Sequence, residues 1–310
     1  MALHVVVGAG PVGTATAQLL ADRGDQVRVV TRRGAGPTNP GIERFACDAT
    51  DPAALARLAE TATAIYNCAQ PAYHRWPQDF PALLNGLIGA AESTGAVLVQ
   101  TGNLYAYGLV DRPMTEALPL RPNSVKGRAR ARVWETSLAA HEAGRIRTAE
   151  VRGSDYLGAN TLSVVTVLLL PAILMGRRAM VPADLDAPHS WTYVGDMART
   201  LVAVADRESA WGRPWHVPTP PPMSIRELAQ QAATVAGAPS PKLATMPSVM
   251  LWLGGLFDKG AKEMREMRYQ FQHPFILDST AAQAEFGITP TPTDAALADT
   301  VTALQTPVPA

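Results

Sequence analysis

The stretch that decides the fold is His4–Val7 (HVVV) followed by Gly8-Ala9-Gly10-Pro11-Val12-Gly13. An apolar strand pattern runs straight into glycines spaced G-x-G-x-x-G, and a helical pattern continues to Arg23. In that context Gly8 permits a tight turn, Gly10 lets a ligand approach the backbone, and Gly13 allows close helix–strand packing. The helix then presents free N–H groups to phosphates. We therefore predict a dinucleotide site formed by Gly8, Gly10, Pro11, Val12 and Gly13.

Strand and helix patterns alternate outward from this stretch as far as Arg152. The predicted strands are His4–Gly8, Gln26–Thr31, Ile42–Cys47, Ala64–Cys68, Ala96–Thr101 and Arg147–Arg152. The predicted helices are Pro11–Arg23, Pro52–Glu60, Gln78–Ser93 and Asn123–Ala143. Such alternation is typical of a parallel sheet covered on both faces, so we predict an α/β fold with a doubly wound (Rossmann) sheet.

Beyond Arg152 the alternation loosens and proline-rich stretches appear at 218–222, 239–241 and 290–292. Helices are still expected at Ser163–Leu174, Asp196–Ala205, Ser224–Ala236 and Pro292–Ala303. We predict a dinucleotide-binding domain over 1–153, to which 189–218 return. A smaller C-terminal substrate lobe would comprise 154–188 and 219–305, and 306–310 would be a disordered tail.

Composition limits the class of protein. The 310 residues are 47% hydrophobic, and 27 basic residues balance 27 acidic ones, which favours neither a nucleic-acid partner nor an anionic membrane. The apolar run 164–176 is short for a membrane span and contains Pro171. Two cysteines, Cys47 and Cys68, and a start without a signal-peptide pattern indicate a reducing compartment. We expect a cytoplasmic protein with a small-molecule substrate.

The end of the second predicted strand indicates which dinucleotide binds. Sites for NAD and FAD usually carry Asp or Glu there for the ribose hydroxyls, whereas this chain has Thr31-Arg32-Arg33. Two cations suit a 2′-phosphate, so the sequence favours NADP(H), with NAD(H) as the alternative. In the alternative interpretation both arginines are solvated surface charges.

Later segments make the chain resemble the extended short-chain dehydrogenase/reductases, the NAD-dependent epimerase/dehydratase group. The segments are Phe45–Asp48, Asn67–Ala69, Thr101–Gly108, Arg152–Gly158 and His189–Ala198, in the family's order. The resemblance implies that Asp48 contacts adenine and that Ala69 and Thr101 lie beside the cofactor.

The catalytic pair of that family, Tyr-x-x-x-Lys followed by Glu four residues after the Lys, has no direct counterpart. With Glu135 as the anchor, Ala131 falls on the Lys position and Gly127 on the Tyr position, and neither transfers protons. The chain therefore resembles atypical members that keep the fold and lack the usual dyad.

Replacement residues come from two nearby segments. Asn103 stands where the family's Ser or Thr contacts the reacting oxygen, and Tyr105 stands where sugar dehydratases carry a Glu. In an extended segment Asn103, Tyr105 and Tyr107 would project to one side, so Tyr105 is a candidate acid or substrate clamp and Asn103 a candidate donor. Tyr107 is a substrate-side candidate or, alternatively, a packing residue. Lys126 is a further candidate cation; alternatively it shares a solvated helix face with the arginines of 128–132.

The substrate side also departs from the resemblance. His189 replaces an Arg that holds a pyrophosphate in nucleotide-sugar enzymes, and Asp155 replaces an Asn. An acid would repel a pyrophosphate, so a neutral or mildly basic molecule is expected. Tyr156 and Trp191 are further substrate-side candidates. In the alternative interpretation Asp155 caps the following helix and His189 is a loop residue. No histidine spacing indicates zinc, and no metal is expected.

These patterns predict an NADP(H)-dependent oxidoreductase that acts on a carbonyl, imine or hydroxyl of a small organic substrate other than a nucleotide sugar. Two alternatives stay open: a non-redox epimerase, isomerase or cyclase that uses the cofactor transiently or structurally, and a cofactor-sensing binding protein. The family often dimerises through its fourth and fifth helices, and a homodimer stays open because the arginines of 128–132 make that surface polar.

Overall fold

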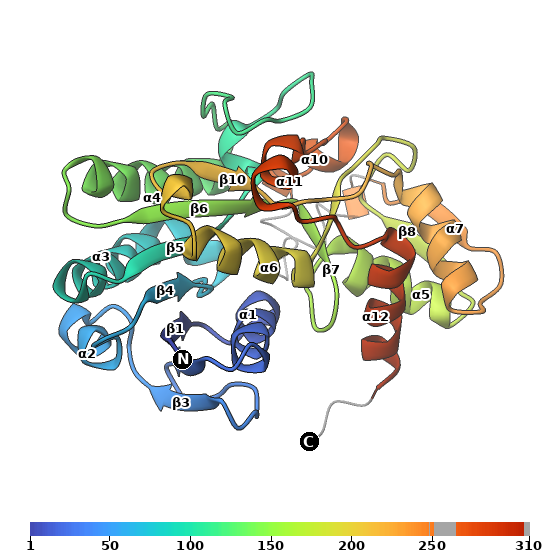
Figure 1. Ribbon diagram of the computed structural model, residues 1–310. Helices are drawn as coiled ribbons and strands as arrows, with labels where there is room; N and C mark the ends of the chain where they lie inside the picture. Colours follow the sequence, from blue (N-terminus) through green and yellow to red (C-terminus); the bar gives the residue numbers. More distant parts are fainter. Residues whose placement is uncertain (248, 251–264, 307–310) are drawn as a thin grey trace.

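The computed structural model describes residues 1–247, 249–250 and 265–306. Within them a seven-stranded sheet has the order β10-β6-β5-β4-β1-β2-β3, and all neighbouring strands are parallel (Figure 1). The strands are β1 (Leu3–Val7), β2 (Gln26–Thr31), β3 (Ile42–Ala46), β4 (Ala64–Asn67), β5 (Val97–Asn103), β6 (Thr148–Gly153) and β10 (Pro214–His216). The predicted Rossmann sheet is confirmed, and the strand order reverses between β1 and β4.

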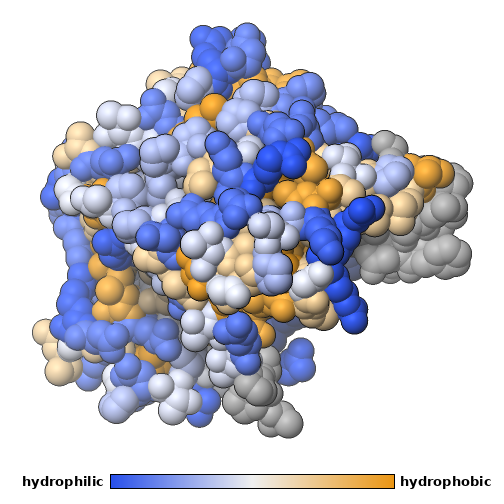
Figure 2. All heavy atoms as spheres, turned by 90° about the vertical axis from the view of Figure 1, so that its right-hand side faces the viewer, coloured by the Kyte–Doolittle hydropathy of each residue, from blue (hydrophilic) through white to orange (hydrophobic). Residues whose placement is uncertain are grey.

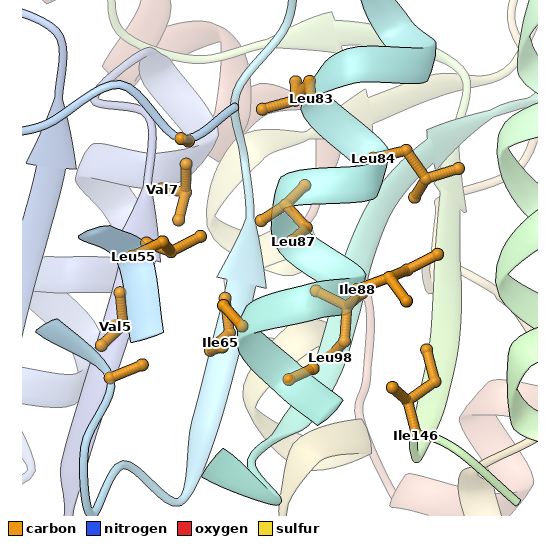
Figure 3. Close-up of a cluster of buried hydrophobic side chains, with 14 of the residues drawn as sticks. Val5, Val7, Leu55, Ile65, Leu83, Leu84, Leu87, Ile88, Leu98 and Ile146 are labelled. Carbon is orange, nitrogen blue, oxygen red and sulfur yellow. The ribbon is translucent and has the colours of Figure 1, made fainter. Parts of the chain in front are cut away.

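Helices cover both faces of this sheet. α1 (Pro11–Asp22) and α6 (Val194–Ala205) pack on one face, and α2 (Pro52–Leu58), α3 (Trp76–Thr94) and α4 (Val125–Glu142) pack on the other (Figure 1). Figure 3 shows how α3 contributes: its leucines and Ile88 lie against side chains of β1, β4 and β5. At about 25 cal/mol per Å² of buried apolar surface, this contact is a main source of sheet stability.

Apart from α6 and β10, most described residues after β6 build a smaller lobe beside the sheet's carboxyl edge (Figure 1). It contains two short parallel pairs, β7 (Asp155–Leu157) with β9 (Trp191–Tyr193) and β8 (Arg178–Val181) with β11 (Lys242–Thr245). Its helices are α5 (Leu170–Leu174), α7 (Ile225–Val235), α10 (Tyr269–Gln272) and α12 (Thr293–Gln305). α11 (Thr280–Phe286) instead packs on the sheet domain, where Phe286 contacts Trp215 of β10. α5, α7 and α12 share a hydrophobic core of their own.

A buried carboxylate fastens this lobe to the sheet domain. Asp196, fully buried in α6, accepts hydrogen bonds from the backbone N–H and the hydroxyl of Thr291, each at 2.7 Å. Thr291 lies two residues before α12, so the link fixes the lobe relative to the face of the sheet that α6 covers. A buried charge is tolerated when several donors satisfy it, and Arg199 is a further donor to Asp196.

The predicted helix over Ser163–Leu174 forms in a different way. Residues Val165–Leu169 make one π-helical turn before α5 begins at Leu170. Pro171 lies at the start of α5, where its missing N–H is tolerated. Of the predicted tail 306–310, only Thr306 lies within the described residues.

Figure 2 views the molecule from the side of the smaller lobe. Hydrophobic surface there lies in separate patches bordered by hydrophilic side chains. The exposed hydrophobic residues of this lobe include Leu162, Val167 and Met175.

Candidate active site

The candidate site lies at the carboxyl edge, where the strand order reverses. Gly8 ends β1 with φ +98°, and a Cβ there would lie 2.7 Å from the backbone of Ala69 after β4. A Cβ on Gly13 would lie 2.0 Å from the carbonyl oxygen of Gly8. Both positions therefore require glycine, because a side chain would force the two loops and α1 apart. Gly10 differs, since a Cβ there would meet no atom of the described residues within 4 Å.

The space over Gly10 faces the N-terminus of α1. No side chain among the described residues caps this helix, and its first turn carries no acid. Pro11 occupies the first turn, where its missing N–H is harmless, so the amides of Val12 and Gly13 remain as donors. Free N–H groups, a helix dipole and open space are the features that a diphosphate requires. The residues thus fit a dinucleotide cofactor.

Thr31, Arg32, Arg33 and Asp48 follow the ends of β2 and β3. Both arginines are exposed, and the hydroxyl of Thr31 donates to the carbonyl of Ala35 at 2.9 Å. Asp48 accepts from the N–H and hydroxyl of Thr50, and these bonds, with a smaller contribution from Arg32, lower its pKa. Arg32 and Asp48 therefore lie near each other beyond the carboxyl ends of β2 and β3.

Thr101, on β5, lies on the opposite side of the reversal. Its hydroxyl donates to the sulfur of Cys68 at 3.6 Å, and its carbonyl oxygen accepts from Arg130 at 3.0 Å. The second guanidinium nitrogen of Arg130 donates to Gln70 at 2.7 Å. Arg130 thus joins α4 to β5 and to the loop after β4, beside the predicted cofactor.

The prediction that the basic residues of α4 share a solvated face is wrong for two of them. Lys126 is 2% exposed and Arg130 is 4% exposed, whereas Arg128 and Arg132 are exposed. Residues four apart lie on one helix face, and here that face packs against the sheet edge. Lys126 and Arg130 have the spacing of the family's Tyr-x-x-x-Lys, one residue earlier than Gly127 and Ala131.

Asn103, Tyr105 and Tyr107 do not project to one side. Leu104–Tyr107 form a single 3₁₀ turn, η2, which Asn103 caps by accepting from the N–H of Tyr105 at 3.2 Å. The alternation argument fails because the extended strand ends at Asn103. Tyr105 stacks on Trp76 with ring centroids 6.2 Å apart, whereas Tyr107 points into a separate buried network.

The Tyr105 phenol is enclosed beside the phenol of Tyr73 and near Gln270. Burial raises the pKa of both phenols far above the ordinary value. A phenol with so high a pKa stays protonated, so Tyr105 can donate a hydrogen bond but is a poor base.

Tyr107, expected on the substrate side, is fully buried. Its hydroxyl lies 2.7 Å from Arg152 and 2.8 Å from His216, and Arg152 also donates to Glu150 at 2.6 Å. The network supports the alternative interpretation of Tyr107 as a packing residue. Burial, foremost, lowers the pKa of His216 to about 4 and keeps that ring neutral.

His189 and Asp155, predicted separately, form a pair. Nε2 of His189 lies 2.9 Å from Oδ2 of Asp155, and Nδ1 lies 3.1 Å from the carbonyl oxygen of Gln270. Both ring nitrogens lie within hydrogen-bond distance of oxygens of the protein, so the ring has no nitrogen left for a further partner. Asp155 begins β7 and does not cap a helix. His189 does lie in the connection between β8 and β9, where it makes isolated bridges with Met223 and Phe275, but it is only 2% exposed.

Aromatic rings enclose this pair. Phe271 stacks on His189 with centroids 5.0 Å apart, and Trp191 lies 4.3 Å away. Trp191 is buried and donates to the carbonyl of Met223, so it positions His189. The hydroxyl of Tyr156 is buried near Gly153 and Arg130.

Sequence reasoning missed Arg130, Tyr73 and Gln270. The four-residue spacing of Lys126 and Arg130 was a usable signal, but Gln270 comes from a distant segment that no pattern linked to the sheet edge. Among the described residues no group of His, Cys, Asp or Glu could hold a metal ion. None of the helices in the described part of the chain is long and apolar enough to cross a membrane.

The sheet order, the glycine turn and the open helix N-terminus define a dinucleotide-binding protein of the Rossmann class. The model of the NAD dependent epimerase/dehydratase family matches residues 4–217, and the chain belongs to this family. Membership places it among NAD-dependent oxidoreductases and epimerases. A search of curated proteins finds no match.

Solved structures share the fold over almost the whole chain at low identity. The enzyme WbmH of Bordetella bronchiseptica, in complex with NAD⁺, has a TM-score of 0.76 and 18% identity over 98% of this chain and 99% of its own. UDP-glucose 4-epimerase of Thermotoga maritima, with UDP-glucose, has a TM-score of 0.79 and 17% sequence identity, and the match covers 98% of each chain. UDP-glucuronic acid 4-epimerase of Bacillus cereus, with UDP-glucuronic acid and NAD, has a TM-score of 0.79 and 16% sequence identity. The match covers 98% of this chain and 99% of the epimerase.

Proposed function

We propose that the chain is an NADP(H)-dependent oxidoreductase of an atypical extended type, acting on a carbonyl, imine or hydroxyl of a small organic molecule that is not a nucleotide sugar. The observation that carries the proposal is the open N-terminus of α1 above Gly10, held by the glycine contacts at Gly8 and Gly13. The atypical character rests on the sequence, in which no Lys follows a Tyr by four residues.

The preference for NADP(H) rests on Arg32 and Arg33. Both are exposed beyond β2, where a ribose-binding acid would stand in an NAD site. A 2′-phosphate would accept charge-assisted hydrogen bonds from them. The similar structures were solved with NAD, so NAD(H) is the alternative cofactor.

The chain's own residues would act as follows. The amides of Val12 and Gly13 hold the diphosphate, Asp48 receives the adenine, and Ala69 and Thr101 border the nicotinamide half. The bound cofactor supplies or accepts a hydride. Tyr105 donates a hydrogen bond to the substrate oxygen, Asn103 offers its amide N–H, and the Lys126 ammonium stabilises or protonates the developing oxyanion.

A substrate other than a nucleotide sugar is favoured by the pair of Asp155 and His189. The neighbours' structures contain UDP-sugars. Here the ring of His189 is enclosed by aromatic side chains and its two nitrogens are occupied, so it has no donor left for a diphosphate. Asp155 lies 2.9 Å from Nε2 of that ring.

A non-redox epimerase, isomerase or cyclase is the second candidate, favoured by the epimerases among the similar structures. A cofactor-sensing protein without turnover is the third. NADPH absorbance separates the three. Steady consumption with a panel of aldehydes, ketones and imines supports the oxidoreductase. Substrate conversion without consumption supports the second candidate, and binding alone the third. NADH is run in parallel, and the Gly13→Ala variant is the negative control.

The same proposal includes the division into a dinucleotide domain, 1–153 with 189–218, and a substrate lobe, 154–188 with 219–305. It places the enzyme in the cytoplasm, in keeping with its two unpaired cysteines. A homodimer would use the groove of about 250 Å³ between α3 and α4, bordered by Pro77, Pro81 and Val125.

A further inference from the structure

A groove lies between α3 and α4, the two helices that cover one face of the sheet side by side (Figure 1). Its volume is about 250 Å³, and every residue that lines it belongs to one of these two helices. An apolar cavity of about 150 Å³ is already large enough to admit benzene. The groove therefore has room for one aromatic ring that carries a short polar substituent.

The inner wall of the groove is apolar and largely aromatic. Trp76 and Phe80 form it on the α3 side, with ring centroids 5.2 Å apart, and Val133 forms it on the α4 side. These three side chains are buried, whereas Pro81 and Val125, nearer the mouth, are exposed. Aromatic rings pack well against each other edge to face or offset, and burying apolar surface is favourable. The wall therefore suits an apolar, preferably aromatic, ligand body.

The rim of the groove carries two positive charges. Arg128 and Arg132 are exposed, lie one helical turn apart on α4, and both line the groove. Neither forms an ion pair within residues 1–247, 249–250 and 265–306. Arg75, just before α3, instead pairs with Asp79 at 2.7 Å. Like charges at this helical spacing repel each other, so an anion between the two rim arginines would be attracted by both.

The described residues that line the groove include no Asp or Glu. Its charge is therefore complementary to an acid and not to a base. Guanidinium groups bind a carboxylate through two parallel hydrogen bonds, which adds geometric selectivity to the attraction. Together, wall and rim indicate a ligand with an apolar ring at one end and a carboxylate at the other.

We propose that the groove between α3 and α4 binds a small aromatic carboxylic acid. The ring lies against Trp76 and Phe80, and Arg128 and Arg132 hold the carboxylate. The site goes beyond the proposed function, because its lining residues lie on α3 and α4 and the cofactor is not needed for binding.

The competing occupant of the groove is a second copy of the chain. In a two-fold symmetric pair the same surface of each copy meets its counterpart. Such a pair would bring Arg128 and Arg132 of both copies together, and their charges would repel. The charge of the rim therefore favours the acid over a second copy.

The test is a saturation-transfer NMR titration of the full chain without cofactor. The probes are 3-phenylpropionate, its neutral amide 3-phenylpropanamide, and acetate, which keeps the charge and lacks the ring. We expect the aromatic acid to bind about fivefold or more tightly than the amide, since exposed ion pairs contribute modestly. Acetate should show no saturable binding. The ring protons of the acid should receive the strongest saturation, because the ring lies against the wall.

Variants assign the binding to residues. The double variant Arg128→Gln/Arg132→Gln should lower the affinity for the acid to that for the amide and change the amide affinity by less than about twofold. Arg44→Gln/Arg57→Gln is the matched control: it removes the same charge from exposed positions on β3 and α2 and should change neither affinity.

A third variant tests the wall. Ala129→Met places a longer side chain at a position that lines the groove and should weaken the acid and the amide alike. Circular dichroism checks the folding of each variant. If Ala129→Met fails to fold, the arginine variant decides, because both of its positions are exposed.

Four outcomes overturn the inference: the acid and the amide bind equally, acetate binds as tightly as the aromatic acid, the control variant loses as much affinity as the rim variant, or neither aromatic probe binds. In the last case, a dimer in sedimentation velocity would assign the groove to a second copy. Failure of the proposed function is measured separately, by NADPH titration. Acid binding to a chain that does not bind NADPH would leave the present inference standing.

Discussion

The candidate site has two ends that are built in different ways: a nucleotide end at the glycine turn after β1, and a reacting end where the candidate catalytic and substrate-side residues lie. The nucleotide end is made of backbone and glycine over residues 8–13, where close contacts fix Gly8 against Ala69 and Gly13 against the carbonyl of Gly8, while Gly10 has open space. The reacting end gathers side chains from β5, η2, α4, β7 and α10. The first end has no room for a side chain at Gly8 or Gly13, whereas the second end can exchange side chains while the sheet stays intact. Such a division lets one fold keep a cofactor and change its chemistry.

The largest effect is expected from Gly13→Ala, which disrupts the nucleotide end. In Gly13→Ala the added Cβ would lie 2.0 Å from the Gly8 carbonyl oxygen, so the turn and α1 must separate. We expect a loss of about 1–3 kcal/mol in the free energy of unfolding. NADPH affinity should fall about a hundredfold, since the amides lose their alignment. Denaturant titration and calorimetry measure the two quantities.

Gly10→Ala is the matched control. Its Cβ meets no described atom within 4 Å, so stability should stay within about 0.5 kcal/mol while NADPH affinity still falls. Wild-type NADPH affinity in Gly13→Ala would show that the cofactor does not bind at this turn.

The second prediction concerns the scaffold beneath the reacting end. His216 has a folded-state pKa of about 4, below the usual 6.5, because it is buried. The unfolded chain therefore binds a proton first, and this contribution to stability is lost as pH falls below about 6.5. Between about pH 8 and pH 5 the loss from His216 is about 2 kcal/mol.

Urea titrations of His216→Gln should show a flatter decline of stability toward acid pH. His74→Gln, which changes an exposed histidine, should keep the wild-type slope. Equal slopes for the wild type and His216→Gln would contradict the buried neutral ring. Burial also lowers the pKa of His4, so part of the decline of stability toward acid pH should remain in His216→Gln and in His74→Gln.

The third prediction tests which cofactor the nucleotide end prefers. Replacing both Arg32 and Arg33 with Ser should weaken NADPH binding about tenfold or more and leave NADH binding within about twofold, because only NADPH carries the 2′-phosphate. Arg44→Ser, on exposed β3, serves as the control. An equal change for both cofactors would remove the two arginines from phosphate recognition.

The smallest effect is expected at the reacting end. Tyr105→Phe removes one hydrogen bond of about 0.5–1.5 kcal/mol, so kcat should fall roughly three- to tenfold with the substrate found in the carbonyl panel. The pH profile should keep its shape, because the phenol does not titrate in the working range. Tyr66→Phe, buried in β4, is the control. Unchanged kcat and KM in Tyr105→Phe would exclude Tyr105 from substrate contact.

Sequence reasoning worked where the physical cause is local. The glycine turn, the first six strands and the helices between them follow from spacing and alternation, and the structure has them within a few residues. β10 was missed as a strand because three residues carry too little pattern. The π-helical turn at Val165 was missed because its side-chain pattern resembles an α-helix.

The reacting end was predictable only in part, because its residues meet through tertiary contacts. His189 and Asp155 were both singled out, but nothing between them in sequence indicated that they pair. Tyr105 and Tyr107 were assigned to one side by a strand rule that does not hold once η2 begins. The burial of Arg130 could not be inferred from a run of arginines that looks like a solvated face.

Calorimetric titration of the unmodified chain with NADPH and NADH tests the central claim most directly. The account predicts one dinucleotide site per chain that binds NADPH about tenfold or more tightly than NADH. If neither cofactor gives measurable heat or competes for the site, the assignment of the crevice above Gly10 is contradicted, although the sheet would remain as described.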